Sequence, residues 1–280
     1  MPELPEVEVA ARNLARWAQG RRLRAVVASE PRALGGGRAS VLESLVGARL
    51  TAVERRGKNL LLTFAAGAKK PVGVWSHLGM TGKWVRRPPA EAAPRFSRVR
   101  LDFDGGVTLH FVDMRLFGFF RVVAGADFGA LPVIAALGPD PLRDGIDAGA
   151  LAQRLAKRRK LPIKVAIMDQ ALIPGVGNIQ ASEGLFRAAI DPRRSAAALE
   201  PAEVRRMARG LLASFRYTLG KFGAADGGEA DIEYVEEPGT RNPFKVYDRA
   251  GARCPRCKKG VITRLVQAGR STYFCPNCQK

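Results

Sequence analysis

The sequence predicts an α+β fold with an N-terminal β-sandwich domain, a helical middle domain and a small C-terminal module built around cysteines. Three observations support this prediction. Short runs rich in β-branched and aromatic residues recur between about residues 22 and 125, whereas residues 147–222 carry helical patterns. All four cysteines lie near the end of the chain, in two pairs with the same internal spacing.

The N-terminal part begins with a predicted helix over residues 5–18. Val7, Ala10, Leu14 and Trp17 recur at helical spacing, and Pro5 suits the first turn. The β-rich runs that follow are LRAVVA, RLTAVERR, NLLLTF, VGVWSHLG, RVRLDF, GVTLHFV and FGFFRVVA. Gly, Pro and Asp punctuate these runs, which is typical of a β-sandwich or barrel.

The middle of the chain is predicted to be helical after a linker, GPDPLRDG. The stretch IMDQALIPGVGNIQASEGLF indicates a helix to about Leu172, a glycine-rich turn, and a second helix with Asn178 as its N-cap. Backbone N–H groups at such a helix N-terminus suit a phosphate, although the same pattern also fits a helical hairpin without a ligand. The predicted segments are 1–130 (β-sandwich with its leading helix), 131–146 (linker), 147–225 (helical), 226–249 (loop and connection) and 250–280 (cysteine module).

The charge of the chain indicates a polyanionic partner. Lys and Arg number 46 against 26 Asp and Glu, a net charge of +20. Residues 154–164 and 251–280 contain basic residues and no acid, whereas 226–237 contains acids and no base. Nucleic acid is the usual partner of such a protein, and an anionic membrane surface is the weaker alternative because no basic amphipathic helix stands out. With no secretory signal and no apolar window of spanning length, a cytoplasmic location is expected.

The four cysteines predict one structural zinc ion. Cys254 and Cys257 form one C-x2-C pair, and Cys275 and Cys278 form a second pair after seventeen intervening residues. Four thiolates at this spacing suit a closed tetrahedral site made by two knuckles. Two disulfides or a redox pair are the competing interpretations. The intervening residues predict a β-hairpin with Arg270 at its tip, where it is either a phosphate or lesion contact or an ordinary surface arginine.

Six motifs, taken together and in order, resemble the formamidopyrimidine-DNA glycosylase family. They are MPELPEVE at the start, RRGKNLLL at 55–62, HLGMTG at 77–82, DMRLFG at 113–118, the MDQ…GVGNIQASE stretch and the terminal GRSTYFCPNCQ. The resemblance runs nearly end to end. It implies a β-sandwich domain, a helix–two-turns–helix domain and a zinc-finger hairpin, with damaged double-stranded DNA bound between two lobes. We expect the protein to be a monomer and to have no membrane partner.

The resemblance also implies a catalytic group. With Met1 removed, Pro2 becomes a secondary amine, and an α-amino group of pKa roughly 8 is partly neutral near pH 7. That amine can attack the deoxyribose C1′, displace the base and form an iminium that permits elimination of both flanking phosphates. Glu3 resembles the family's acid/base carboxylate, and Lys58 and Arg270 resemble family residues that assist catalysis. A well-started helix would explain PELPE equally well if that motif stood alone.

Further residues match the family's DNA contacts. Met80, Arg115 and Phe117 match the set that fills the space left by an extruded nucleotide, although methionine and phenylalanine more often pack in a core. The remaining predicted DNA-binding residues are His77, Arg159, Asn178 and Tyr247.

The predicted function is therefore base-excision repair. The enzyme removes formamidopyrimidines, with 8-oxoguanine as a further candidate lesion, and cleaves the abasic strand by β,δ-elimination. The alternative is a non-catalytic zinc-dependent nucleic-acid-binding protein. Met114, Leu116 and Phe96 depart from the family pattern. The acidic segment 226–243 also departs from it, so we expect formamidopyrimidines to be excised at least as well as 8-oxoguanine.

Overall fold

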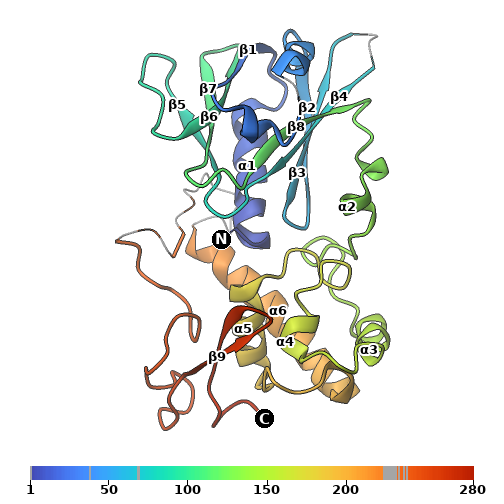
Figure 1. The fold of residues 1–280 in the computed structure, drawn as a ribbon, viewed down its shortest axis with the longest axis vertical. Coiled ribbons are helices and arrows are strands. Elements are labelled where there is room, and N and C mark those ends of the chain that lie inside the picture. Colours follow the sequence, from blue (N-terminus) through green and yellow to red (C-terminus); the bar gives the residue numbers. More distant parts are fainter. Residues whose placement is uncertain are drawn as a thin grey trace. The chain divides into compact units, whose positions relative to one another are not determined.

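The computed structural model describes residues 2–37, 39–67, 70–222, 232, 234–235, 237 and 239–280 (Figure 1). The chain divides into two compact units. The first contains residues 1–2, 6–135 and 222–236, and the second contains residues 3–5, 136–221 and 237–280. Most of the acidic segment 226–237, on which the expected lesion preference rests, lies outside the described residues.

The first unit is a β-sandwich, as the sequence predicts. One antiparallel sheet has the order β2 (Arg49–Arg56), β3 (Asn59–Ala65), β4 (Val72–His77) and β8 (Phe119–Ala124). The other has the order β1 (Leu23–Ala28), β6 (Ser97–Phe103), β7 (Val107–Val112) and β5 (Lys83–Arg87). Trp84 of β5 joins the two layers, because its ring meets Phe120 of β8 at 5.9 Å between centroids and its N–H reaches Ser76 of β4 at 3.4 Å.

Helix α1 (Leu4–Ala18) precedes the strands and buries the predicted stripe of Val7, Ala10, Leu14 and Trp17. Short helical turns complete this unit: η1 (Pro31–Leu34), η2 (Ala39–Leu45), η3 (Phe128–Ala130) and α2 (Pro132–Ala135). The seven predicted β-runs all become strands, but β5 is not among the predicted runs. Its sequence KWVRR is short and mostly basic, so it gives little hydrophobic signal.

The second unit packs helices around one apolar core. Its elements are α3 (Ala148–Ala156), α4 (Ile163–Ala166), α5 (Asn178–Ala188), η4 (Ala196–Ala198) and α6 (Pro201–Lys221), followed by the hairpin of β9 (Thr263–Gln267) and β10 (Arg270–Phe274). Leu155, Ile167, Leu185, Leu211 and Phe215 are fully or almost fully buried in the core of this unit. Among the described residues, no helix is long and apolar enough to cross a membrane.

Two local predictions in this unit are wrong. The predicted helix to Leu172 ends at Ala166, because the Asp169 carboxylate accepts the N–H of Ala171 (2.9 Å) and the Asp169 carbonyl accepts that of Leu172 (2.9 Å), which forms a turn. Asn178 is the first residue of α5 and not its N-cap, a position that Gly177 occupies without a side-chain bond.

Candidate active site and metal centre

The Glu3 carboxylate takes the place of the missing N-cap. Glu3 is 1% exposed, and its oxygens accept the N–H groups of Gly177 (2.9 Å), Ile179 (2.7 Å) and Gln180 (3.0 Å). These donors are the orphan groups of the α5 N-terminus, where the helix dipole also favours a negative charge. A Cβ on Gly177 would lie 2.5 Å from Glu3 Oε1, so only glycine leaves room. The predicted anion site of the GVGN turn is therefore filled by the protein's own carboxylate.

The residue after Glu3 is fixed to the same turn. Leu4 donates its N–H to the Gly175 carbonyl (3.0 Å), and Gly175 has a φ of 90°, which disfavours any residue with a Cβ. A Cβ there would also lie 2.7 Å from Leu4 Cδ1. Pro2, which is itself buried, directly precedes this anchored pair.

A buried lysine, Lys164, lies beside this helix N-terminus. Its side chain is fully buried and its Nζ donates to Asn178 Oδ1 (2.5 Å), while Asn178 Nδ2 donates to the Ser271 carbonyl of β10 (2.9 Å). Burial, followed by the charge of Arg270, lowers the pKa of Lys164 to about 8. Asn178 thus joins α4 and α5 to the hairpin that carries Arg270.

In the sequence, Lys164 stands out only as one charge in a basic run. The residues on either side of it, Ile163 and 165–167, are apolar, and this pattern could have indicated that the lysine lies in a buried stretch. Arg270 itself is exposed and begins β10, so the hairpin tip is Ala268–Gly269 and not Arg270.

In the first unit, His77 and Lys58 influence one another electrostatically. Burial, and next the charge of Lys58, lower the pKa of His77 to about 4, so the imidazole is neutral at pH 7. Because His77 Nδ1 accepts the N–H of Gly79 (2.9 Å), its other ring nitrogen carries the proton and can donate it to an anion. Lys58 follows the Gly57 turn that joins β2 to β3.

Two loops of the first unit carry Met80, Arg115 and Phe117, the residues that match the family set for filling the space left by an extruded nucleotide. Phe117 is 56% exposed and Arg115 is exposed, and the Arg115 guanidinium lies 5.0 Å from the centroid of the Phe117 ring. Met80 is half-buried on the loop between β4 and β5. Phe117 is therefore not a core residue, and neither is its neighbour Met114, which is also 56% exposed.

Tyr247 and Arg159 occupy different surroundings in the second unit. Glu183 Oε1 accepts three successive N–H groups, from Lys245 (2.9 Å), Val246 (2.7 Å) and Tyr247 (3.1 Å), and so holds the turn that carries Tyr247. No sequence pattern predicts this role of Glu183. Arg159 is exposed, and its carbonyl accepts the Ser195 hydroxyl (2.9 Å).

The four cysteine sulfurs fit a tetrahedral zinc ion. All lie within 4.8 Å of one another, with Cys254–Cys278 at 3.7 Å and Cys257–Cys275 at 3.9 Å. Zn–S bonds of about 2.3 Å place the sulfurs of a regular tetrahedron about 3.8 Å apart. The cysteines are free rather than joined in disulfides. Cys254, Cys257, Cys275 and Cys278 therefore form the site of one structural zinc ion.

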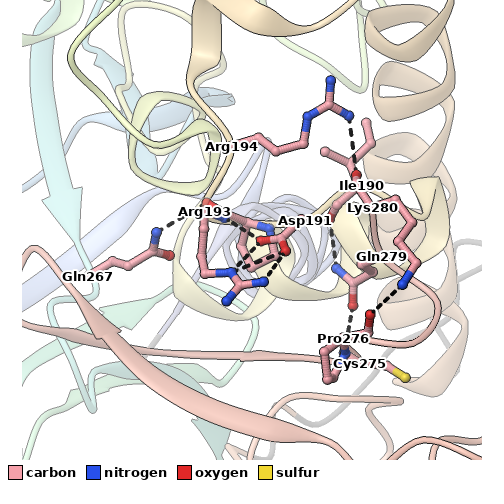
Figure 2. A network of polar contacts seen from close by, with 10 residues as sticks. Ile190, Asp191, Arg193, Arg194, Gln267, Cys275, Pro276, Gln279 and Lys280 are labelled. Carbon is pink, nitrogen blue, oxygen red and sulfur yellow. Dashed lines mark hydrogen bonds and ion pairs between the residues drawn. The ribbon is translucent and has the colours of Figure 1, made fainter.

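The zinc module is attached to the segment that follows α5 (Figure 2). The buried side chain of Gln279 donates to the Ile190 carbonyl (2.8 Å) and accepts the N–H of Cys275 (2.9 Å). The Lys280 carbonyl accepts the N–H of Asp191 (3.0 Å) and a bond from Arg194 (3.2 Å). The zinc ligand Cys275 is thus linked through Gln279 to the segment that follows α5.

Comparisons with known proteins cover nearly the whole chain. Family models match at residues 1–120 (formamidopyrimidine-DNA glycosylase N-terminal domain), 137–221 (formamidopyrimidine-DNA glycosylase H2TH domain) and 251–280 (zinc finger found in FPG and IleRS). Curated proteins named formamidopyrimidine-DNA glycosylase from Laribacter hongkongensis and Acidiphilium cryptum are 40% and 38% identical, with both chains fully covered in each case. Among solved structures, that of wild-type Lactococcus lactis Fpg (MutM) in complex with DNA containing N7-benzyl-Fapy-dG matches with a TM-score of 0.84 over the full length of both chains. The two sequences are 27% identical.

Proposed function

The chain belongs to the formamidopyrimidine-DNA glycosylase family, and we propose that its reaction begins at the secondary amine of Pro2. The protein is a DNA glycosylase with abasic-site lyase activity that acts in base-excision repair. Relatives matched from end to end carry this enzyme name, so the alternative of a non-catalytic binding protein is not retained.

In the proposed reaction, the Pro2 nitrogen bonds to C1′ of the damaged nucleotide. The glycosidic bond breaks, its electron pair leaves with the base, and the base takes a proton. The amine loses its proton, and the C1′–O4′ bond of the sugar then opens with a proton going to O4′, which leaves an iminium between Pro2 and C1′. That iminium withdraws electrons from C2′, so loss of a C2′ proton expels the 3′ phosphate, and a second elimination expels the 5′ phosphate. One bound zinc ion would hold the C-terminal module together and takes no part in these steps.

The geometry of Glu3 carries this proposal. Three N–H donors fix a buried carboxylate one residue after the nucleophile, which suits a group that moves protons on the sugar and the departing base. Neutral His77 and the Lys58 cation offer phosphate contacts in the first unit. Asn178 and Arg270 offer a second set in the helical unit, where the buried Lys164 amine holds the Asn178 amide in place. Arg159 and Tyr247 are proposed as outer phosphate contacts.

Borohydride trapping on a duplex with one abasic site tests the nucleophile. The adduct should form at Pro2, located by mass spectrometry of the digested complex, because reduction fixes only an iminium. Pro2→Gly keeps a primary amine at the same place and should trap more slowly. Lys58→Met serves as the control and should leave the adduct site unchanged. An adduct on a lysine, or equal trapping by Pro2→Gly, would show that the assignment is wrong.

The lesion range is also a proposal. Six carboxylates in residues 226–237 could accept hydrogen bonds from the N–H groups of a ring-opened formamidopyrimidine. Tyr234, a described residue of this segment, is buried and donates its hydroxyl to the Gly82 carbonyl (2.5 Å) within the first unit. We expect single-turnover excision of formamidopyrimidine to match or exceed that of 8-oxoguanine in identical duplexes. A strong preference for 8-oxoguanine that survives deletion of 229–237 would contradict this.

We also propose a monomer that works in the cytosol on chromosomal DNA, with the segments 1–130, 147–225 and 250–280 acting as its catalytic, helical and zinc-finger parts. The net charge of +20 opposes self-association and favours a polyanion. Sedimentation equilibrium at physiological salt should give the mass of one chain, and a concentration-dependent dimer would overturn the monomer.

A further inference from the structure

Asp113 joins the two loops that carry Met80, Arg115 and Phe117. The first loop, 78–82, connects β4 to β5, and the second, 113–118, connects β7 to β8. The side chain of Asp113 is fully buried. Its Oδ1 accepts the Thr81 hydroxyl (2.6 Å) and the N–H of Arg115 (3.1 Å), and its Oδ2 accepts the N–H of Gly118 (2.8 Å). One carboxylate therefore holds both loops.

The loops also touch backbone to backbone. A Cβ on Gly79 would lie 2.7 Å from the Phe117 carbonyl oxygen, and a Cβ on Gly118 would lie 2.7 Å from that of His77. Any larger residue at either glycine would push the loops apart. The carboxylate bonds thus stabilise an interface that already fits closely.

A third segment fixes the backbone of Asp113. Asp113 donates its N–H to the Phe96 carbonyl (3.1 Å), and its own carbonyl accepts Arg98 Nε (2.7 Å). Phe96 has a φ of 64°, a left-handed conformation that is uncommon for an aromatic residue and persists only where its surroundings hold it. The guanidinium groups of Arg95 and Arg98 lie 4.5 and 5.4 Å from the Phe96 ring centroid, and such contacts stabilise it.

We propose that Asp113 is a positioning residue that makes the two loops one preorganised wedge. This inference rests on the proposed function of Met80, Arg115 and Phe117 in filling the space left by the extruded nucleotide. Phe117 is exposed and enters the base stack only when DNA binds. A loop that is already ordered loses less conformational entropy at that moment than a mobile loop. Because Asp113 is buried, it acts through Thr81, Arg115 and Gly118 and does not touch DNA.

The test removes the Thr81 hydroxyl, which donates to Asp113 and also accepts the N–H of Arg115 (3.3 Å), without opening a cavity. Thr81→Val deletes the hydroxyl that binds Asp113, and Thr81→Ser keeps it. Thr108→Val is the matched control, because Thr108 makes the same kind of bond to a carboxylate, that of Asp102 (2.8 Å), in the same unit. Each variant is measured in two assays. One is single-turnover excision of formamidopyrimidine from a duplex, and the other is strand cleavage of a single-stranded oligonucleotide with a preformed abasic site, where no stack needs filling.

Thr81→Val should lower duplex excision about 10-fold, the loss expected for one hydrogen bond to a charged acceptor, and change single-strand cleavage less than twofold. Thr81→Ser should restore duplex excision to within about threefold, because it restores that bond, and Thr108→Val should leave the ratio of the two rates unchanged. Equal losses in both assays, or no loss in either, would overturn the clamp.

Phe117→Ala separates this inference from the function on which it rests. If Phe117→Ala lowers duplex excision selectively and Thr81→Val does not, only the role of Asp113 is wrong. If Phe117→Ala changes both rates equally, the space-filling assignment is itself wrong. A 2-aminopurine opposite the lesion gives an independent readout, because its fluorescence changes when a side chain occupies the vacated space.

Discussion

Replacing Gly177 with alanine should displace the Glu3 carboxylate and slow base excision. The new Cβ would lie 2.5 Å from Glu3 Oε1 and 2.8 Å from Glu3 Cγ, and ordinary contact requires at least 3.4 Å. Glu3 must therefore move by about 1 Å, which stretches hydrogen bonds of 2.7 to 3.0 Å beyond their useful range. The φ of Gly177 is −128°, which alanine adopts freely, so the clash and not backbone strain is the perturbation.

The size of the effect follows from those bonds. A hydrogen bond to a charged group contributes about 1.5–3 kcal/mol, so losing one or two of the three costs about 3 kcal/mol. A displacement of about 1 Å in a catalytic group can lower a rate roughly 100-fold. We expect a fall of that order in single-turnover excision from a duplex, together with a lower Tm.

Gly220→Ala is the matched control for Gly177→Ala. Gly220 lies in α6 with open space where a Cβ would point, so this variant should leave the excision rate unchanged and stabilise the helix slightly. If Gly177→Ala excises within twofold of the unmodified enzyme and keeps its Tm, the carboxylate is not held as described and the reasoning fails.

Two further predictions concern the second unit. The folded-state pKa of Lys164, about 8, lies below the ordinary value of 10.5, so the unfolded chain binds more protons between these values and stability should rise with pH across that window, by on the order of 3 kcal/mol. Urea unfolding at pH 8 and pH 10 should show this rise in the unmodified enzyme and in the control Lys160→Met, whose lysine is exposed. Lys164→Met should not show the rise. An equal rise in all three proteins would refute the role of Lys164. Cys275→Ser should lower zinc content and DNA affinity together, because the hairpin that carries Arg270 depends on the metal site. Metal analysis beside a binding titration checks this, and full affinity in metal-free protein would contradict it.

The sequence predicts what local patterns encode. Short runs rich in β-branched and aromatic residues locate seven of the eight strands in the described part of the first unit, and cysteine spacing locates the zinc ligands. Interactions between segments far apart in sequence are not predicted. Glu3 caps a helix that begins 175 residues later. The local pattern therefore assigns the N-cap role to Asn178, although the Glu3 carboxylate fills it. Asp113 and Glu183 stand in the motifs DMRLFG and GVGNIQASE, but nothing in the sequence indicates their roles, because a carboxylate that binds backbone N–H groups leaves no pattern in the composition or spacing of its partners.

The attachment of the zinc module to the end of α5 has a consequence during synthesis. Residues 275–280 leave the ribosome after every segment that they contact, including 189–194, and domains generally fold in the order in which they are made. The helical core can therefore form while the cysteine module is still incomplete, and Arg270 is placed only when residues 275–280 dock. A growing chain therefore lacks its full DNA-binding surface until residues 275–280 have been made and have docked.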